Sequence, residues 1–211
     1  GTPTTLSAPQ LDRLMGELAD HIDLSGCTEY TVEAGRPDTI TAEKLAVLAR
    51  RGCSRVSVNP QTMQDAVLER MGRAHRADDI LRAYALARES GIGCINMDLI
   101  AGLPGDSAAG FRASLEQVLD LGPENVTVHT LALKKGSRLM EEGGGLPSGA
   151  AVADMLDFAW AALRAAGQRP YYLYRQKYMS GSFENVGWCR PGAESLYNIC
   201  MMEELHTILS L

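Results

Sequence analysis

The sequence lacks the features that mark several large classes of protein. Its 211 residues contain no apolar run long enough to span a membrane, and they do not open with a signal-peptide pattern. No long basic run occurs, and the net charge of −6 makes nucleic acid and anionic membrane surfaces poor candidates for partners. With 45% hydrophobic and 22% charged residues, the composition predicts a globular protein of the cytoplasm.

The cysteines form no recognisable ligand set or disulfide framework. There are five, they lie far apart, and none stands in a C-x-x-C motif. An odd number of widely spaced cysteines is typical of buried thiols in a reducing compartment. Isolated cysteines behave mostly as small hydrophobic residues, so the sequence offers no metal site within this chain.

What the sequence does have is a regular alternation of strand and helix signals. The helix signals include a capping box at Ser7-Ala8-Pro9-Gln10 and an apolar periodicity over 148–167. The strand signals lie at 29–35, 54–59, 94–102, 125–133 and 170–174. Strands that alternate with helices predict a parallel βα sheet, either open or part of a barrel.

Three later segments break this alternation. Residues 133–149 indicate a flexible linker, and 184–198 indicate a loop or an extended segment. Residues 201–211 predict a final apolar helix or strand.

Polar residues follow the predicted strands near the point where each one ends. They are Glu33, Asn59, Gln61, Asp98, His129 and Thr130. Because the carboxyl ends of parallel strands meet at one edge of a sheet, we expect these side chains to form one ligand site. Asp98 stands inside an apolar run, where burial is costly unless the carboxylate is paired or binds something. The alternative is that Asp98 caps a neighbouring turn.

The chemistry of this set predicts a binding rim, because no member is a nucleophile beside a base. Carboxylates would accept hydrogen bonds from an amine and from hydroxyl groups, and an arginine would bind a carboxylate. We therefore expect a polar, zwitterionic ligand. Arg73, within GRAHRADD at 72–79, is a candidate for the arginine, and a solvated charged loop is the alternative.

Five motifs, in order and spacing, together resemble one known family. They are GTPT at 1–4, VEAGRP at 32–37, RVSVNPQTM at 55–63, GRAHRADD at 72–79 and MDLIAGLPG at 97–105. Over essentially all of residues 1–140 the sequence resembles the oxygen-independent coproporphyrinogen III oxidase family of radical S-adenosylmethionine (SAM) enzymes. The segments YYLYRQKYMSGSFENVGW and YNICMMEE are similar to its coproporphyrinogen dehydrogenase branch. The fold class implied is α/β, a partial (β/α) barrel of the radical SAM type without its first two strands.

The resemblance implies SAM as a cofactor and indicates which residues contact it. The positions that match the family's SAM contacts are Gly1, Thr2, Glu33, Gln61, Arg73, Asp98 and Ala132. The first three would lie near the methionyl amine. The next two resemble the residues that hold the ribose and the methionyl carboxylate, and the last two lie on the adenosine side. This chain has Asn59-Pro60-Gln61 where the family usually has a Gly-Val-Gln turn.

The resemblance also implies a [4Fe–4S] cluster that this chain cannot ligate. Family members hold it on a C-x-x-x-C-x-x-C loop, and the sequence contains no such motif. We therefore expect an internal fragment of a longer enzyme, inactive alone. Residues 1–140 would be the remainder of the barrel with the SAM contacts, and 141–211 a C-terminal extension that closes its side and is a candidate substrate-binding region. The missing strands would leave an exposed sheet edge, through which the fragment would dimerise or aggregate.

The reaction implied is the oxidative decarboxylation of coproporphyrinogen III propionates to vinyl groups, which gives protoporphyrinogen IX in haem biosynthesis. The porphyrinogen is the expected substrate, and an electron donor or acceptor protein is a further expected partner. A substrate with four carboxylates calls for basic and aromatic residues. The candidates are Tyr172, Tyr174, Arg175, Lys177 and Tyr178. The alternative is a half-exposed strand whose aromatic residues cover the core. No catalytic residue is assigned.

Other functions stay open at this point. Relatives of this family act as haem-binding chaperones instead of oxidases. An unrelated βα-barrel enzyme with a phosphate-bearing substrate would need a glycine-rich turn that opens a helix. AGLPGDS at 101–107 is the only contender, and Pro104 removes one of the N–H donors that such a turn needs. An inert regulatory half-barrel is the last alternative.

Overall fold

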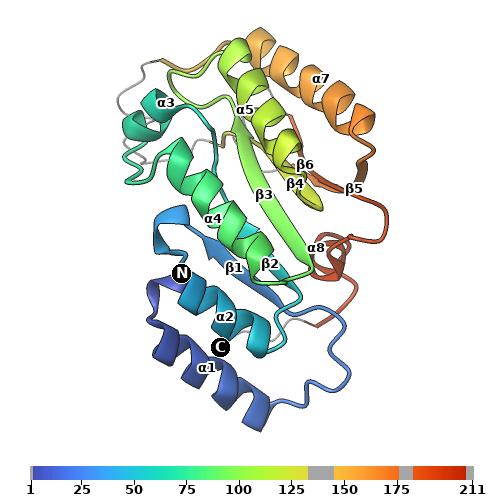
Figure 1. Cartoon of the computed structure of the whole chain (residues 1–211). Coiled ribbons are helices and arrows are strands. Elements are labelled where there is room, and N and C mark those ends of the chain that lie inside the picture. The colour runs from blue at the N-terminus through green and yellow to red at the C-terminus, as the bar shows by residue number, and fades with distance from the viewer. Residues whose placement is uncertain (1, 133–144, 176–182, 208–211) are drawn as a thin grey trace.

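The computed structural model describes residues 2–132, 145–175 and 183–207, in which six strands form a single sheet (Figure 1). The strands are β1 (Thr31–Gly35), β2 (Arg55–Val58), β3 (Cys94–Ala101), β4 (Asn125–Thr130), β5 (Arg169–Tyr174) and β6 (Asn185–Cys189). Their order across the sheet is β1-β2-β3-β4-β6-β5. Strands β1 to β4 pair in parallel, as predicted.

Strand β6 departs from the prediction. It lies in the segment expected to be a loop or extended chain, and it pairs antiparallel with β4 on one side and with β5 on the other. The prediction of an all-parallel sheet is therefore wrong at this position. Every residue of β6 is buried, because strands flank it on both sides and both of its faces are covered.

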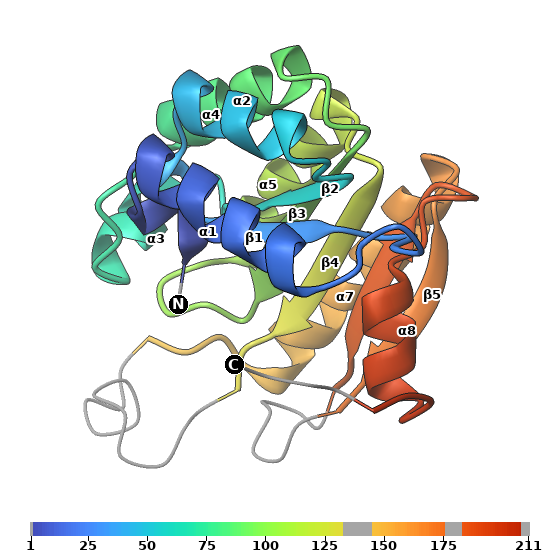
Figure 2. The same ribbon diagram turned by 90° about the horizontal axis from the view of Figure 1, so that it is seen from below.

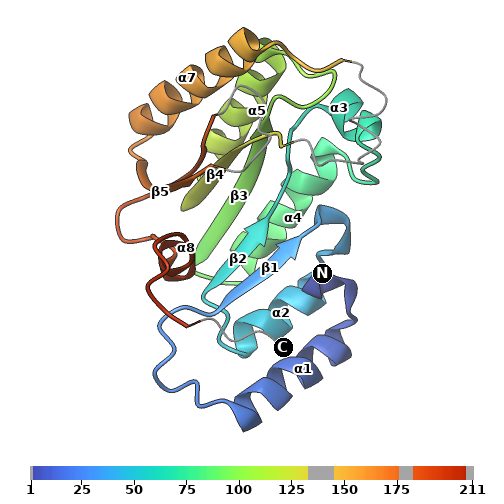
Figure 3. The same cartoon turned by 180° about the vertical axis from the view of Figure 1, so that it is seen from behind.

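Helices cover one face of the sheet. The α-helices are α1 (Ala8–His21), α2 (Ala42–Arg50), α3 (Asp65–Arg70), α4 (Ala77–Glu89), α5 (Ala108–Leu121), α7 (Gly149–Ala165) and α8 (Leu196–Met202), with short 3₁₀ turns η1 (Pro3–Thr5) and η2 (Pro37–Thr39). Figures 1 and 3 view the sheet from its two sides, and α1, α2, α4, α5 and α7 all lie on the same side. Figure 2 shows α8 on the opposite side, beside β5.

Two of the predicted helix signals are confirmed. The capping box is present, since Gln10 N donates to Ser7 Oγ at 3.4 Å and Ser7 N donates to Gln10 Oε1 at 2.9 Å. The helix predicted over 148–167 is α7. The final helix begins at Leu196, before the predicted segment 201–211, because Ser195 caps its amino end. Most of the predicted linker 133–149 lies outside the described residues.

Strand β3 shows how the two faces of the sheet differ. Ile95, Met97 and Leu99 are fully buried in the core beneath the helices. Asn96 and Asp98 alternate with them and face the other side, because successive side chains of a strand point to opposite faces. The sheet therefore has an apolar face under the helices and a polar face turned away from them. Strands β1 and β5 are the edges of the described sheet, and dimerisation through such an edge stays a prediction.

Candidate functional site

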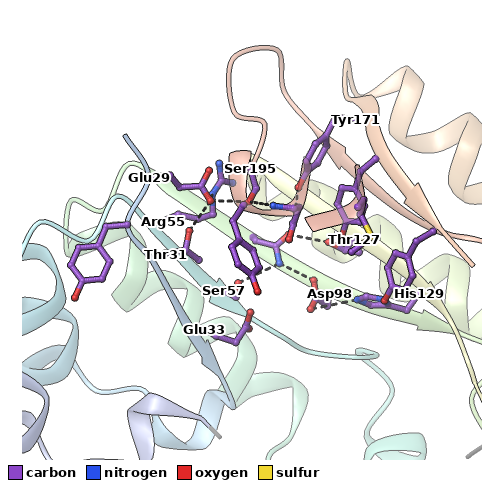
Figure 4. A pocket seen from close by; sticks show the side chains of 17 residues that line it. Glu29, Thr31, Glu33, Arg55, Ser57, Asp98, Thr127, His129, Tyr171 and Ser195 are labelled. Atoms are coloured by element: carbon purple, nitrogen blue, oxygen red, sulfur yellow. Dashed lines mark hydrogen bonds and ion pairs between the residues drawn. The ribbon is translucent and has the colours of Figure 1, made fainter. Parts of the chain in front are cut away.

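The polar face of the sheet lines a cavity of about 670 Å³ (Figure 4). Five strands each contribute a pair of side chains spaced two residues apart, and Tyr171 of β5 lines the cavity as well. These pairs are Thr31 and Glu33, Arg55 and Ser57, Asn96 and Asp98, Thr127 and His129, and Tyr172 and Tyr174. The spacing follows from the period of a β-strand, which presents every second side chain to the same face. The cavity is thus the interior of the partial barrel.

Two carboxylates face this cavity near the carboxyl ends of their strands. Glu33 Oε1 accepts a hydrogen bond from Asn59 Nδ2 at 2.6 Å. Asp98 Oδ1 accepts one from Asn96 Nδ2 at 2.7 Å, and its Oδ2 lies 3.7 Å from His129 Nε2. Asp98 therefore belongs to a hydrogen-bonded network inside the cavity, and the alternative that it caps a turn is wrong. Burial, and next the charge of Asp98, raise the pKa of Glu33 above its usual 4.5.

This shift predicts how stability depends on pH. Because the pKa is raised in the folded state, the stability that Glu33 contributes is present below pH 4.5 and is lost as the pH rises through the raised pKa. A Glu33→Gln variant, whose amide oxygen can still accept from Asn59, should be more stable than the wild type at pH 7 and should lose that advantage at low pH. Thermal unfolding from pH 4 to 8 measures this. The exposed Glu17→Gln is the control, and parallel curves for Glu33→Gln and wild type would contradict the assignment.

A buried arginine near the amino ends of the strands binds the C-terminal part of the chain. Arg55 Nη2 donates to the carbonyl oxygens of Ala193 and Glu194, each at 3.0 Å. Its Nη1 donates to Asn125 Oδ1, and its Nε lies 3.6 Å from Glu29 Oε1. Only 7% of Arg55 is exposed, so these partners replace the water that its guanidinium lost on folding.

Glu29 also binds the C-terminal part of the chain. Its carboxylate accepts hydrogen bonds from Ser195 Oγ at 2.8 Å and from Leu196 N at 2.6 Å, which fixes the start of α8. Tyr197 and Asn198 of α8 also line the cavity. Helix α8 therefore forms the floor of the cavity at the end opposite the strand carboxyl termini.

Tyrosines of β5 form one wall. The Tyr172 and Tyr174 rings lie within 11° of parallel with centroids 6.3 Å apart, and Tyr171 meets Tyr172 edge-on at 4.8 Å. Burial raises the pKa of Tyr171 to about 12 and also raises that of Tyr172. Both phenols are therefore neutral at physiological pH and can donate hydrogen bonds.

Comparison with known proteins identifies the family. The description of the matching family model is Radical SAM superfamily, and it matches residues 1–118, more than half of the 211-residue chain. The chain belongs to the radical SAM superfamily. This membership excludes the alternative of an unrelated βα-barrel enzyme.

Relatives are found over nearly the whole of this radical SAM chain. It is 44% identical, over all of its length and 43% of the relative, to the oxygen-independent coproporphyrinogen-III oxidase-like protein HemZ of Bacillus subtilis (strain 168). It is 32% identical to the heme chaperone HemW of the same strain, over 94% of this chain and 50% of HemW. The solved structure of coproporphyrinogen III oxidase (HemN) from Escherichia coli matches 96% of the chain at 25% identity with a TM-score of 0.76, and 44% of HemN is covered.

These matches confirm the predicted family resemblance and the α/β fold class, an open sheet consistent with a partial barrel of the radical SAM type. The chain spans about half the length, or less, of the relatives it matches. Within the part that the structure describes, no helix is long and apolar enough to cross a membrane. Nor do three His, Cys, Asp or Glu side chains of the described residues gather as ligands for a metal ion.

The structure brings five of the predicted site residues of this radical SAM chain into the cavity, namely Glu33, Asp98, His129, Tyr172 and Tyr174. Three more lie at the same edge of the sheet without lining the cavity. Thr2 lies against Gly35 at the end of β1, Gln61 N donates to the carbonyl oxygen of Asp98 at 2.9 Å, and Ala132 follows β4. Gln61 has a φ of 69°, which is uncommon for a residue other than glycine and is often found at ligand sites.

The remaining predicted residues lie elsewhere. Arg73, in the loop between α3 and α4, is not among the described residues that line the cavity. Arg175 is exposed and forms an ion pair with Glu184. Gly1, Lys177 and Tyr178 lie outside the described residues.

Several cavity residues of this radical SAM chain were not predicted from its sequence. Ser57, Asn96 and Thr127 lie two positions from residues of the same cavity, so the period of two along each strand could have found them. Arg55 lies two positions from Ser57 and Glu29 two positions from Thr31, so the same period includes them, but it does not show what they bind. Their partners lie far along the chain, in the segment 193–196, and only the folded structure brings them together.

Proposed function

We propose that this chain is the SAM-binding and substrate-binding part of an oxidoreductase of haem biosynthesis in the cytoplasm. Its reaction would be the oxidative decarboxylation of coproporphyrinogen III propionates to vinyl groups, giving protoporphyrinogen IX. The observation that carries the proposal is the cavity, which combines carboxylates near the strand carboxyl ends with a wall of tyrosines. Similarity to proteins named coproporphyrinogen-III oxidase-like and coproporphyrinogen III oxidase supports this substrate.

The charges in the cavity fit SAM. Glu33 and Asp98 repel each other, and a ligand with positive charge between them would relieve that repulsion. SAM carries an ammonium group and a sulfonium, and its ribose hydroxyls can donate hydrogen bonds to carboxylates. The residues proposed to contact it are Gly1, Thr2, Glu33, Gln61, Arg73, Asp98 and Ala132. They would bind and orient SAM and exclude water around it.

When bound, SAM and a [4Fe–4S] cluster supply the radical that removes a hydrogen from a propionate. The described residues gather no ligand set for a metal, so we assign them no role in holding the cluster. We propose residues 1–140 as the SAM-contacting part and 141–211 as the part that closes the barrel side and contacts substrate. An electron donor or acceptor protein would be the further partner.

The test uses the full-length protein that contains this chain, with its cluster reconstituted under anaerobic conditions. We expect 5′-deoxyadenosine and vinyl products from coproporphyrinogen III when SAM, a reductant for the cluster and a one-electron acceptor for the substrate radical are supplied. An Asp98→Ala variant, assayed at limiting SAM, serves as the matched control with reduced turnover. Release of 5′-deoxyadenosine without vinyl products would overturn this substrate, and release of neither would overturn the oxidoreductase.

Haem binding without turnover is the second candidate function. It is favoured by 32% identity to a protein named heme chaperone, over 94% of the chain. The same preparation distinguishes the two candidates. A chaperone would bind haem and form no vinyl product, whereas an oxidase would consume coproporphyrinogen III.

A further inference from the structure

A glycine on β6 determines how the tyrosine wall lies. Tyr172 pairs with Gly187 in the register between β5 and β6. A Cβ built on Gly187 would overlap Cδ1 and Cε1 of the Tyr172 ring and would lie 2.6 Å from its Cζ. The φ of Gly187 is outside the left-handed region, so any residue could adopt its backbone conformation. Glycine is needed here because the ring of Tyr172 lies across it.

This arrangement makes the wall flat. With its ring laid over Gly187, Tyr172 is nearly parallel to Tyr174, and both tyrosines line the cavity. A side chain at position 187 would push the Tyr172 ring toward the interior and narrow the space in front of it. Flat aromatic faces bind other rings by stacking.

The charges around the wall limit how a ligand with carboxylates can enter. Glu29, Glu33 and Asp98 are acidic, and they line the floor and the opposite side of the cavity. Among the described lining residues only Arg55 and His129 are basic. Arg55 is engaged by Glu29 and by backbone carbonyls, and His129 lies beside Asp98. Carboxylates of a ligand are therefore repelled from the interior, whereas an uncharged ring is not.

We propose that Tyr172, held flat by Gly187, and Tyr174 form a platform for one pyrrole ring of the substrate, whose carboxylates point toward the mouth of the cavity. Position 187 is then a specificity-determining residue, because a side chain there would narrow the space that the pyrrole ring occupies. This inference rests on the proposed function, because it takes the substrate to be a carboxylate-bearing tetrapyrrole. It adds the orientation of that substrate and the residues that impose it.

The experiment measures binding of coproporphyrin III, the stable oxidised form of the proposed substrate, to the full-length protein by absorbance and fluorescence titration. We expect Gly187→Ala and Tyr172→Leu each to weaken binding by about tenfold, the size of a lost aromatic stacking contact. Tyr172→Phe, which keeps the ring, should bind like the wild type. Leu173→Ala is the matched control, since Leu173 lies on the other face of β5 and is 62% exposed.

The double variant Gly187→Ala/Tyr172→Leu separates the platform from general damage to the fold. Without the ring there is nothing for the new methyl group to displace, so the double variant should bind no more weakly than Tyr172→Leu. Losses that add, or wild-type binding by Tyr172→Leu, would overturn the platform. SAM binding, measured in the same proteins, should stay unchanged. A wild type that binds SAM but neither coproporphyrin III nor haem would instead overturn the proposed function and the platform with it.

Discussion

An Arg55→Met variant is expected to have a free energy of unfolding about 3–5 kcal/mol lower than the wild type, because the change leaves a buried charge without its partner. Methionine fills much of the same volume but donates no hydrogen bond. The Glu29 carboxylate, with 11% of its side chain exposed, then loses the guanidinium 3.6 Å away. The carbonyl oxygen of Glu194 loses its donor as well.

Chemical denaturation of the 211-residue chain, followed by tryptophan fluorescence, measures this loss. Arg50→Met is the matched control. Arg50 forms an ion pair with Asp12 at 3.1 Å, but 60% of its side chain is exposed, so its loss should cost about 1 kcal/mol or less. Equal losses in the two variants would contradict the buried network.

The double variant Arg55→Met/Glu29→Gln tests the cause of the loss. Removing the carboxylate's charge together with the guanidinium leaves no uncompensated ion, so part of the lost stability should return. Limited proteolysis adds a local measurement. Cleavage within 190–202 should be faster in Arg55→Met, because the network that holds this segment to the sheet is broken.

An Asp98→Ala variant of the full-length protein is expected to bind SAM at least about tenfold more weakly than the wild type, the size of a lost charge-assisted hydrogen bond. Asp98 faces the cavity and lies in a network with Asn96 and His129. Arg175→Ala should change SAM affinity little, since Arg175 is 57% exposed and is engaged by Glu184 outside the cavity.

Calorimetric titration of SAM into the reconstituted protein gives both affinities. Asp98→Asn provides a finer comparison, because it keeps the shape of the side chain and removes its charge. If the SAM affinity of Asp98→Asn lies between those of the wild type and Asp98→Ala, the two differences give the separate contributions of charge and of packing. If the Asp98→Ala and Arg175→Ala proteins bound SAM equally well, the proposed SAM site would be wrong.

The strands and residues that were predicted carry a local signal in the sequence, and strand β6, which was not predicted, lacks one. Strands β1 to β4 were predicted because each is a short apolar or β-branched run between helix signals. Glu33 and Asp98 were predicted because carboxylates in such strands are costly to bury without a function. Strand β6 was missed because all five of its residues are buried, which leaves no alternation, and because Gly187 at its centre is typical of a loop.

The floor of the cavity was beyond the reach of local patterns. Arg55 and the carbonyl oxygen of Glu194 are 139 positions apart in the chain, and no periodicity connects them. Arg175 is the opposite case. It was grouped with the tyrosines because it follows them in sequence, but it lies just beyond the end of β5 and pairs with Glu184 at the surface.

The position of β6 between β4 and β5 also has a consequence for biosynthesis. Strands β1 to β4 leave the ribosome in the order in which they pair, so each finds its neighbour already made. Strand β5 emerges with no partner, because β6, the only strand it pairs with in the described sheet, is translated after it. The tyrosine wall can therefore assemble only after β6 has been made, and a chain that ends before Asn185 would have the acidic side of the cavity and an unpaired aromatic strand.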